Sequence, residues 1–90
     1  MDIYAQVAQK IITEQESIIG PVAYEQARKV PGLSVDQGKK EVVLRGDGKV
    51  ILQKLVEKYG NLFGQASVEV CKDAIRNLQV SPDNLPALLR

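Results

Sequence analysis

The segment from Val30 to Gly48 interrupts the hydrophobic period of the chain, and this interruption most constrains the fold. On both sides of it apolar residues recur every three or four positions, whereas inside it they alternate with polar residues. Two short alternating runs joined by a glycine-containing turn predict an antiparallel two-stranded hairpin at about residues 33–45. Its apolar face comprises Leu33, Val35, Val42 and Leu44. Because an isolated two-stranded ribbon is marginally stable in water, this face must pack on helices or join a larger sheet with another chain.

The segment before the hairpin predicts a helix. Its apolar residues follow helical steps from Tyr4 to Val30, and the pattern is interrupted at Gly20-Pro21. Proline removes a backbone N–H donor and clashes with the preceding turn. We therefore expect an N-terminal helix that is either kinked or split at Gly20-Pro21.

The segment after the hairpin returns to the helical period over about residues 48–78. Asp47 is expected to cap this long helix, which can bend between Gly60 and Gly64. Ser81-Pro82 predicts the start of a short C-terminal helix, because proline is favoured at the first helical position. Ninety residues support one modest core, so the expected fold is a mostly helical α+β domain spanning residues 1–90.

The length of the predicted 48–78 helix favours self-association. If continuous, it would extend about 45 Å at 1.5 Å per residue, which is longer than a compact domain of this size covers. A projecting helix would expose an apolar stripe unless a second subunit covered it. The sequence thus favours a homodimer or another protein partner, and the expected interaction face is Leu55, Tyr59, Leu62, Phe63, Val68 and Ile75.

The residue types required by common active sites are scarce. The chain has no histidine and a single cysteine, Cys71, which falls in the apolar phase of a predicted helix. The Gly46-Asp47-Gly48 run is too short for a phosphate-binding loop. We therefore predict that the protein is not an enzyme, and we predict no catalytic residue, metal ligand or cofactor.

The charge distribution leaves a second possibility open. The net charge is only +1, but residues 28–58 contain eight basic and four acidic residues. An anionic partner would be contacted by Lys39, Lys40, Arg45 and Lys49, and the phosphates of a nucleic acid also by Lys54 and Lys58. Nucleic-acid binding is the alternative to protein interaction, and it is not favoured because no aromatic residues lie among these basic ones for base stacking.

A third and least favoured possibility is a small-ligand or enzyme site at a dimer seam, bearing Tyr24, Arg28 or Tyr59.

The chain has no apolar run of the roughly 20 residues that a membrane span requires, and its first residues lack the features of a signal peptide. These observations, together with the lone cysteine, predict a cytoplasmic protein without membrane association.

The order of elements from Ala27 to Gly60 resembles part of the heavy-metal-associated domain family. In these ferredoxin-like proteins a helix, a strand similar to residues 30–36, a strand similar to residues 41–47 and a second helix follow in the same order. The family binds metal through a Cys-x-x-Cys loop after its first strand, and the chain has neither that cysteine pair nor an obvious preceding strand. Metal binding is therefore not implied.

The sequence favours a non-enzymatic interaction or oligomerisation module with a regulatory or adaptor role.

Overall fold

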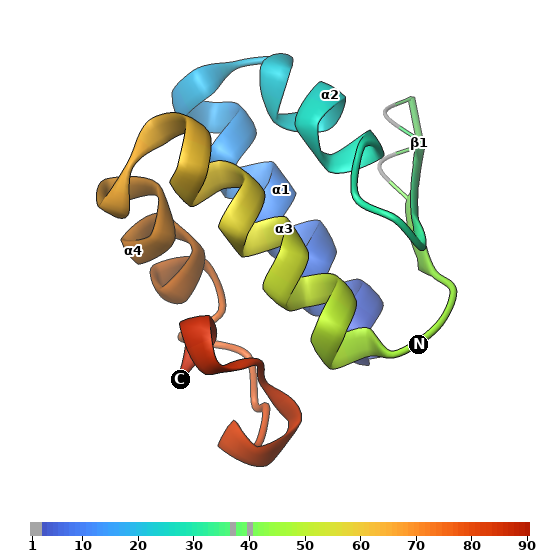
Figure 1. Ribbon diagram of the computed structural model, residues 1–90, viewed down its shortest axis with the longest axis vertical. Helices are drawn as coiled ribbons and strands as arrows, with labels where there is room; N and C mark the ends of the chain where they lie inside the picture. The colour runs from blue at the N-terminus through green and yellow to red at the C-terminus, as the bar shows by residue number, and fades with distance from the viewer. Residues whose placement is uncertain (1–2, 37, 40) are drawn as a thin grey trace.

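The computed structural model of the protein describes residues 3–36, 38–39 and 41–90. Within this part of the chain, four α-helices and two short 3-10 helices accompany one two-stranded hairpin (Figure 1). In chain order the elements are α1 (Ile3–Ile19), α2 (Val22–Arg28), β1 (Leu33–Asp36), β2 (Glu41–Leu44), α3 (Gly48–Phe63), α4 (Gln65–Ala74), η1 (Pro82–Asn84) and η2 (Ala87–Leu89). The prediction of a mostly helical α+β fold is confirmed.

The N-terminal helical segment is split at the predicted position. Helix α1 ends at Ile19 and α2 begins at Val22. Between them Gly20 has a φ of +75°, a left-handed conformation that glycine adopts without steric cost. The chain thereby changes direction, and α2 packs beside α1 instead of continuing it.

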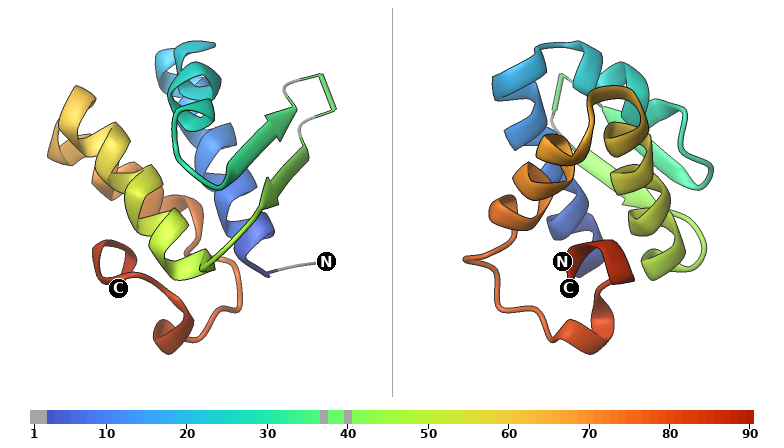
Figure 2. Two further views of the ribbon diagram at one scale, coloured as in Figure 1. Left: turned by 45° about the vertical axis from the view of Figure 1, so that its right-hand side comes forward. Right: turned by 60° about the vertical axis from the view of Figure 1, so that its left-hand side comes forward.

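The hairpin finds its support inside the same chain. Leu33 pairs with Leu44, and Val35 pairs with Val42, in an antiparallel register. All four side chains contact the main core, while β1 lies against α2 and β2 lies against α1 (Figure 2). The hairpin therefore does not depend on a second chain to cover its apolar face. The predicted turn lies partly outside the described residues.

The chain reverses direction at Gly64, so the predicted long helix becomes two helices. Asp47 caps α3 as expected, because its side chain accepts hydrogen bonds from the backbone N–H groups of Lys49 and Val50. Helix α3 ends at Phe63, and Gly64 has φ and ψ of 89° and −178°. Helix α4 then packs back against α3 and α1. The predicted bend is confirmed as a full reversal, and the projecting continuous helix is not formed.

The helices and the hairpin share one core, formed mainly by aliphatic residues. Its largest fully buried side chains are Tyr24, Tyr59, Ile11, Ile12, Leu52, Leu55, Gln15, Val7, Val56 and Cys71. The longest dimension is 30 Å, which is shorter than the roughly 45 Å that a continuous helix over residues 48–78 would require.

The C-terminal segment forms 3-10 turns in place of the expected short helix. Ser81 caps η1 through its side-chain oxygen, with Pro82 in the first turn, and Leu89 of η2 is buried in the core.

The described sheet has two strands, so the ferredoxin-like fold is not formed although the helix-strand-strand-helix order is present. No helix in the described ranges has the length and apolar character needed to cross a membrane.

Candidate interaction surface

The predicted interaction face is divided between the core and the surface. Four of its six side chains lie in the core of the chain itself: Leu55, Tyr59, Val68 and Ile75. Leu62 and Phe63, at the end of α3, remain exposed by 52% and 39%. The reason is the reversal at Gly64, which folds α4 over the part of the apolar stripe that a straight helix would have left bare.

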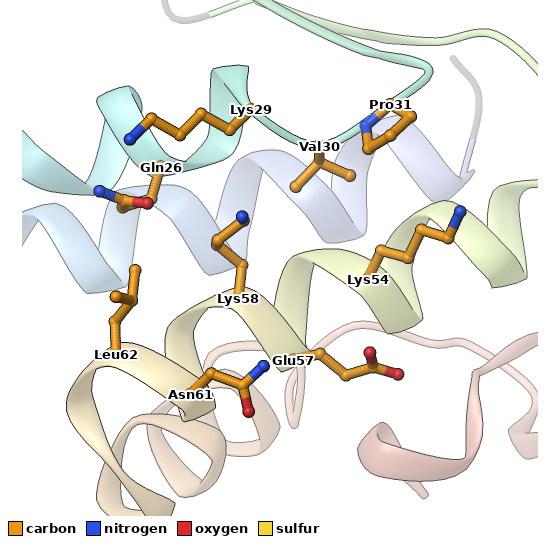
Figure 3. A pocket seen from close by; sticks show the side chains of 9 residues that line it. All are labelled: Gln26, Lys29, Val30, Pro31, Lys54, Glu57, Lys58, Asn61 and Leu62. Atoms are coloured by element: carbon orange, nitrogen blue, oxygen red, sulfur yellow. The ribbon is translucent and has the colours of Figure 1, made fainter.

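A groove of about 460 Å³ runs between α2 and α3 beside exposed Leu62. Figure 3 shows its two walls, one formed by α2 and the turn that follows it and the other by the middle and end of α3. The lining residues are Gln26, Lys29, Val30, Pro31, Lys54, Glu57, Lys58, Asn61 and Leu62.

Helical spacing explains why these residues line one groove. Lys54, Lys58 and Leu62 are four residues apart and therefore share one face of α3. On the opposite wall, Gln26 and Lys29 are three residues apart at the C-terminal part of α2. Helix α2 begins and α3 ends at the same end of the molecule (Figure 1), and Leu62, near the end of α3, lines the groove toward that end.

The groove carries excess positive charge. Lys29, Lys54 and Lys58 line it, whereas its one lining carboxylate, Glu57, points away from α2 (Figure 3). Glu57 instead accepts a hydrogen bond of 3.1 Å from Gln53 Nε2 on its own helix. Among the described residues, no carboxylate forms an ion pair with any of the three lysines.

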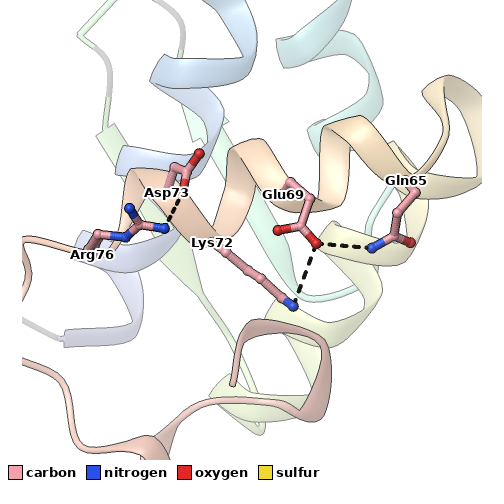
Figure 4. A network of polar contacts seen from close by, with 5 residues as sticks. All are labelled: Gln65, Glu69, Lys72, Asp73 and Arg76. Carbon is pink, nitrogen blue, oxygen red and sulfur yellow. Dashed lines mark hydrogen bonds and ion pairs between the residues drawn. The ribbon is translucent and has the colours of Figure 1, made fainter.

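The exposed charges of α4 show the contrasting arrangement. Arg76, in the turn that follows α4, is 2.6 Å from Asp73, and Lys72 is 3.8 Å from Glu69, which also accepts a hydrogen bond from Gln65 (Figure 4). The charges on α4 are thus paired along the helix, whereas those facing the groove are not.

Buried contacts fix the two walls of the groove relative to each other. The Tyr59 hydroxyl donates a 2.7 Å hydrogen bond to the carbonyl oxygen of Ala23, which joins α3 to α2. Burial, aided by the neighbouring Cys71 and Tyr24, raises the pKa of Tyr59 well above its ordinary value, so this hydroxyl keeps its proton. Val30 is 2% exposed and closes the floor. The groove is therefore preformed.

The tyrosines expected at a dimer seam belong to the interior. Tyr24 and Tyr59 are buried within the chain, and Arg28 is exposed at the end of α2. The Tyr24 hydroxyl lies 3.5 Å from Glu16 Oε1, and the pKa of Tyr24 is raised by burial and by that carboxylate. The structure does not bring these three side chains together on one surface.

Of the basic residues predicted to contact an anion, Lys39, Arg45 and Lys49 lie outside the groove. Lys39 belongs to the hairpin turn and Arg45 follows β2, while Lys40 falls outside the described residues. Lys49, in the first turn of α3, lines a separate hollow with Lys54. Of the lysines that do face the groove, Lys54 and Lys58 were expected from the sequence to contact nucleic-acid phosphates, whereas Lys29 was not singled out.

Cys71 is buried, as its helical phase predicts. Burial raises the pKa of its thiol to about 11, against a smaller opposing effect of the hydrogen bond from Gln15 Nε2. At neutral pH the thiol is protonated and a poor nucleophile. Among the described residues, no three side chains of the metal-ligating types gather at one site.

No protein-family model matches the chain, and neither a curated protein nor a solved structure shows significant similarity to it.

Proposed function

We propose that the protein is a non-enzymatic interaction module that binds a partner protein across the groove between α2 and α3. The observation that carries this proposal is the exposure of Leu62 beside a preformed groove whose lysines have no ion-pair partner among the described residues. Exposed apolar side chains next to unpaired charges favour binding to another surface. Such a module would serve a regulatory or adaptor role.

We further propose that the partner is a different protein. Two arguments for a homodimer came from the sequence, namely an unsupported hairpin and a projecting helix. In this fold the hairpin packs on α1 and α2, and α4 covers the apolar stripe of α3. Mass measurement tests this proposal against the homodimer that the sequence favours. The lone Cys71 thiol suits a reducing compartment, so we expect the partner among cytoplasmic proteins.

Site-specific photo-cross-linking tests the proposed function. A benzophenone amino acid is placed at Leu62 in one variant and at Val43 in a matched control. These two side chains are 52% and 51% exposed, and Val43 lies on the hairpin away from the groove. After irradiation in the source cell, we expect discrete protein adducts from position 62 only, identified by mass spectrometry.

The adducts discriminate between the possible outcomes. An adduct of twice the chain mass would identify a second copy and support the homodimer. Absence of adducts from both positions, or equal adducts from both, would contradict a binding surface at the groove.

A further inference from the structure

We propose that the α2–α3 groove binds an acidic, amphipathic segment of a partner protein. This inference rests on the proposed function and specifies the chemistry of the partner. It follows from three properties of the groove: its charge, its apolar surface and its length.

The positive charge of the groove favours a partner that carries carboxylates. Lys29 lines one wall, and Lys54 and Lys58 line the other; the Lys58 ammonium group lies between the walls, and those of Lys29 and Lys54 extend toward opposite ends of the groove (Figure 3). With Glu57 as the one acidic lining residue, the charged side chains of the groove sum to +2. An acidic segment would pair with ammonium groups that have no carboxylate partner among residues 3–36, 38–39 and 41–90.

The groove also has an apolar surface, which favours a partner that supplies an apolar side chain in addition to negative charge. Val30 forms the floor, Pro31 lies beside it, and Leu62 stands at the rim. A polypeptide can place an aliphatic side chain on this surface while its carboxylates reach the lysines. A nucleic acid fits less well, because no aromatic residue lines the groove to stack on a base.

The length of the groove limits the segment that it can hold. Helix α2 has seven residues and is therefore about 10 Å long. That length matches about two turns of a bound helix, or about three residues of extended chain.

A peptide titration of the full chain tests the inference. The probe is a fluorescein-labelled peptide in which glutamates alternate with leucines at helical spacing. A glutamate-only peptide of equal length and a single-stranded oligonucleotide are the comparison probes. Anisotropy gives the Kd, and backbone amide shifts of the labelled protein locate the site.

We expect the amphipathic peptide to bind more tightly than either comparison probe, with amide shifts at residues 26–31 and 54–62. The double variant Lys54→Gln/Lys58→Gln should weaken binding about fivefold, since exposed charge pairs each contribute modestly. The matched control Lys10→Gln/Lys72→Gln removes the same charge from lysines outside the groove that pair along their own helices. Its Kd should change less than about twofold, because distant surface charges are screened.

Three results would overturn the inference: an equal effect of the two double variants, equal binding of the glutamate-only peptide, or tighter binding of the oligonucleotide. If position 62 cross-links a partner whose affinity does not change in Lys54→Gln/Lys58→Gln, the proposed function stands and the inference of an acidic segment is wrong. If position 62 yields no adduct, the proposed function itself fails.

Discussion

Gln15 Nε2 lies 3.3 Å from Cys71 Sγ in the core, which places a buried amide of α1 against the middle of α4. The same nitrogen donates a 2.9 Å hydrogen bond to the carbonyl oxygen of Ser67 in the first turn of α4. The other amide atom, Oε1, is buried and has no hydrogen-bond partner in the described part of the chain. One side chain thus links the first and last α-helices while leaving an acceptor unsatisfied.

Replacing Gln15 should separate the effect of its volume from that of its polarity. Gln15→Ala should lower the free energy of unfolding by about 2–4 kcal/mol, because it removes a hydrogen bond and opens a cavity. Gln15→Leu keeps most of the volume and removes the unsatisfied oxygen, so its cost should stay below about 1.5 kcal/mol. Urea denaturation measures both values. Equal destabilisation by the two substitutions would show that the polar contacts dominate, because both remove these contacts and only alanine also removes the volume.

The buried Cys71 thiol should make stability fall at alkaline pH. The folded chain raises the pKa of this thiol from 9.0 to about 11, so between these values the folded state retains a proton that the unfolded state loses. This stabilisation is complete below pH 9 and decreases as the pH rises, by about 1.4 kcal/mol at pH 10. Tyr59 and Tyr24, whose pKa values are also raised, add to the loss at higher pH.

Unfolding measured between pH 8 and about pH 10 tests this effect against Cys71→Ala, which lacks the titrating group. The variant is less stable at every pH, but its stability should decrease less steeply over that interval. Identical slopes would show that the thiol pKa is not raised by folding.

The hydrogen bond beneath the groove should contribute measurably to the stability of the two helices that form its walls. Tyr59→Phe removes the 2.7 Å bond to the Ala23 carbonyl oxygen and should lower the free energy of unfolding by about 1 kcal/mol. Tyr24→Phe is the matched control, because its contact with Glu16 is long, at 3.5 Å, and should cost less. Hydrogen exchange should show faster opening of α2 in Tyr59→Phe alone. Equal destabilisation by both variants would show that the Tyr59 hydrogen bond between α3 and α2 contributes no more to stability than the Tyr24 contact.

Local signals in the sequence were sufficient to predict the elements. Proline at position 21 predicted the split of the first helix, and Asp47 predicted the start of α3, because each acts on backbone groups within one turn. The alternation of Leu33 and Val35 with polar neighbours predicted the first strand in the same way. These features depend on residues close in sequence, so they can be recognised without the fold.

The positions of the elements in space could not be predicted in this way. The apolar period of residues 48–78 shows which face is buried, but it does not show whether a second subunit or α4 covers it. Only the conformation of Gly64 decides this. Likewise, the four-residue spacing from Lys54 through Lys58 to Leu62 shows a shared face of α3, but the groove exists because α2 lies opposite. That juxtaposition depends on the whole fold.

The reversal at Gly64 should tolerate no side chain. Its φ of 89° with ψ of −178° falls in a region populated almost only by glycine, although a Cβ there would meet no atom within 4 Å. Gly64→Ala should therefore cost about 1–3 kcal/mol through backbone strain alone. Gly20 also has open space around it, but its φ of 75° is left-handed, which asparagine accepts. Thermal unfolding should thus rank Gly20→Asn above Gly64→Asn in stability, and the reverse order would contradict the reversal described for Gly64.

Leu55 and Leu62 lie two turns apart on α3, and truncation should destabilise the fold at Leu55 but not at Leu62. Leu55 is fully buried, so Leu55→Ala should lower the free energy of unfolding by about 2–5 kcal/mol. Leu62 is 52% exposed, so Leu62→Ala should change it by less than about 0.5 kcal/mol while weakening partner binding.

Repeating the Leu62→Ala measurement at two protein concentrations tests self-association. If a second copy covered Leu62, the melting temperature of the unsubstituted chain would rise with concentration, because association stabilises only the folded state. Truncating Leu62 would reduce that rise. We expect the melting temperature to be independent of concentration for both chains, with sedimentation giving the mass of a monomer. A concentration-dependent rise that Leu62→Ala removes would instead establish Leu62 as a contact between identical subunits, because no change inside a single folded chain produces that dependence.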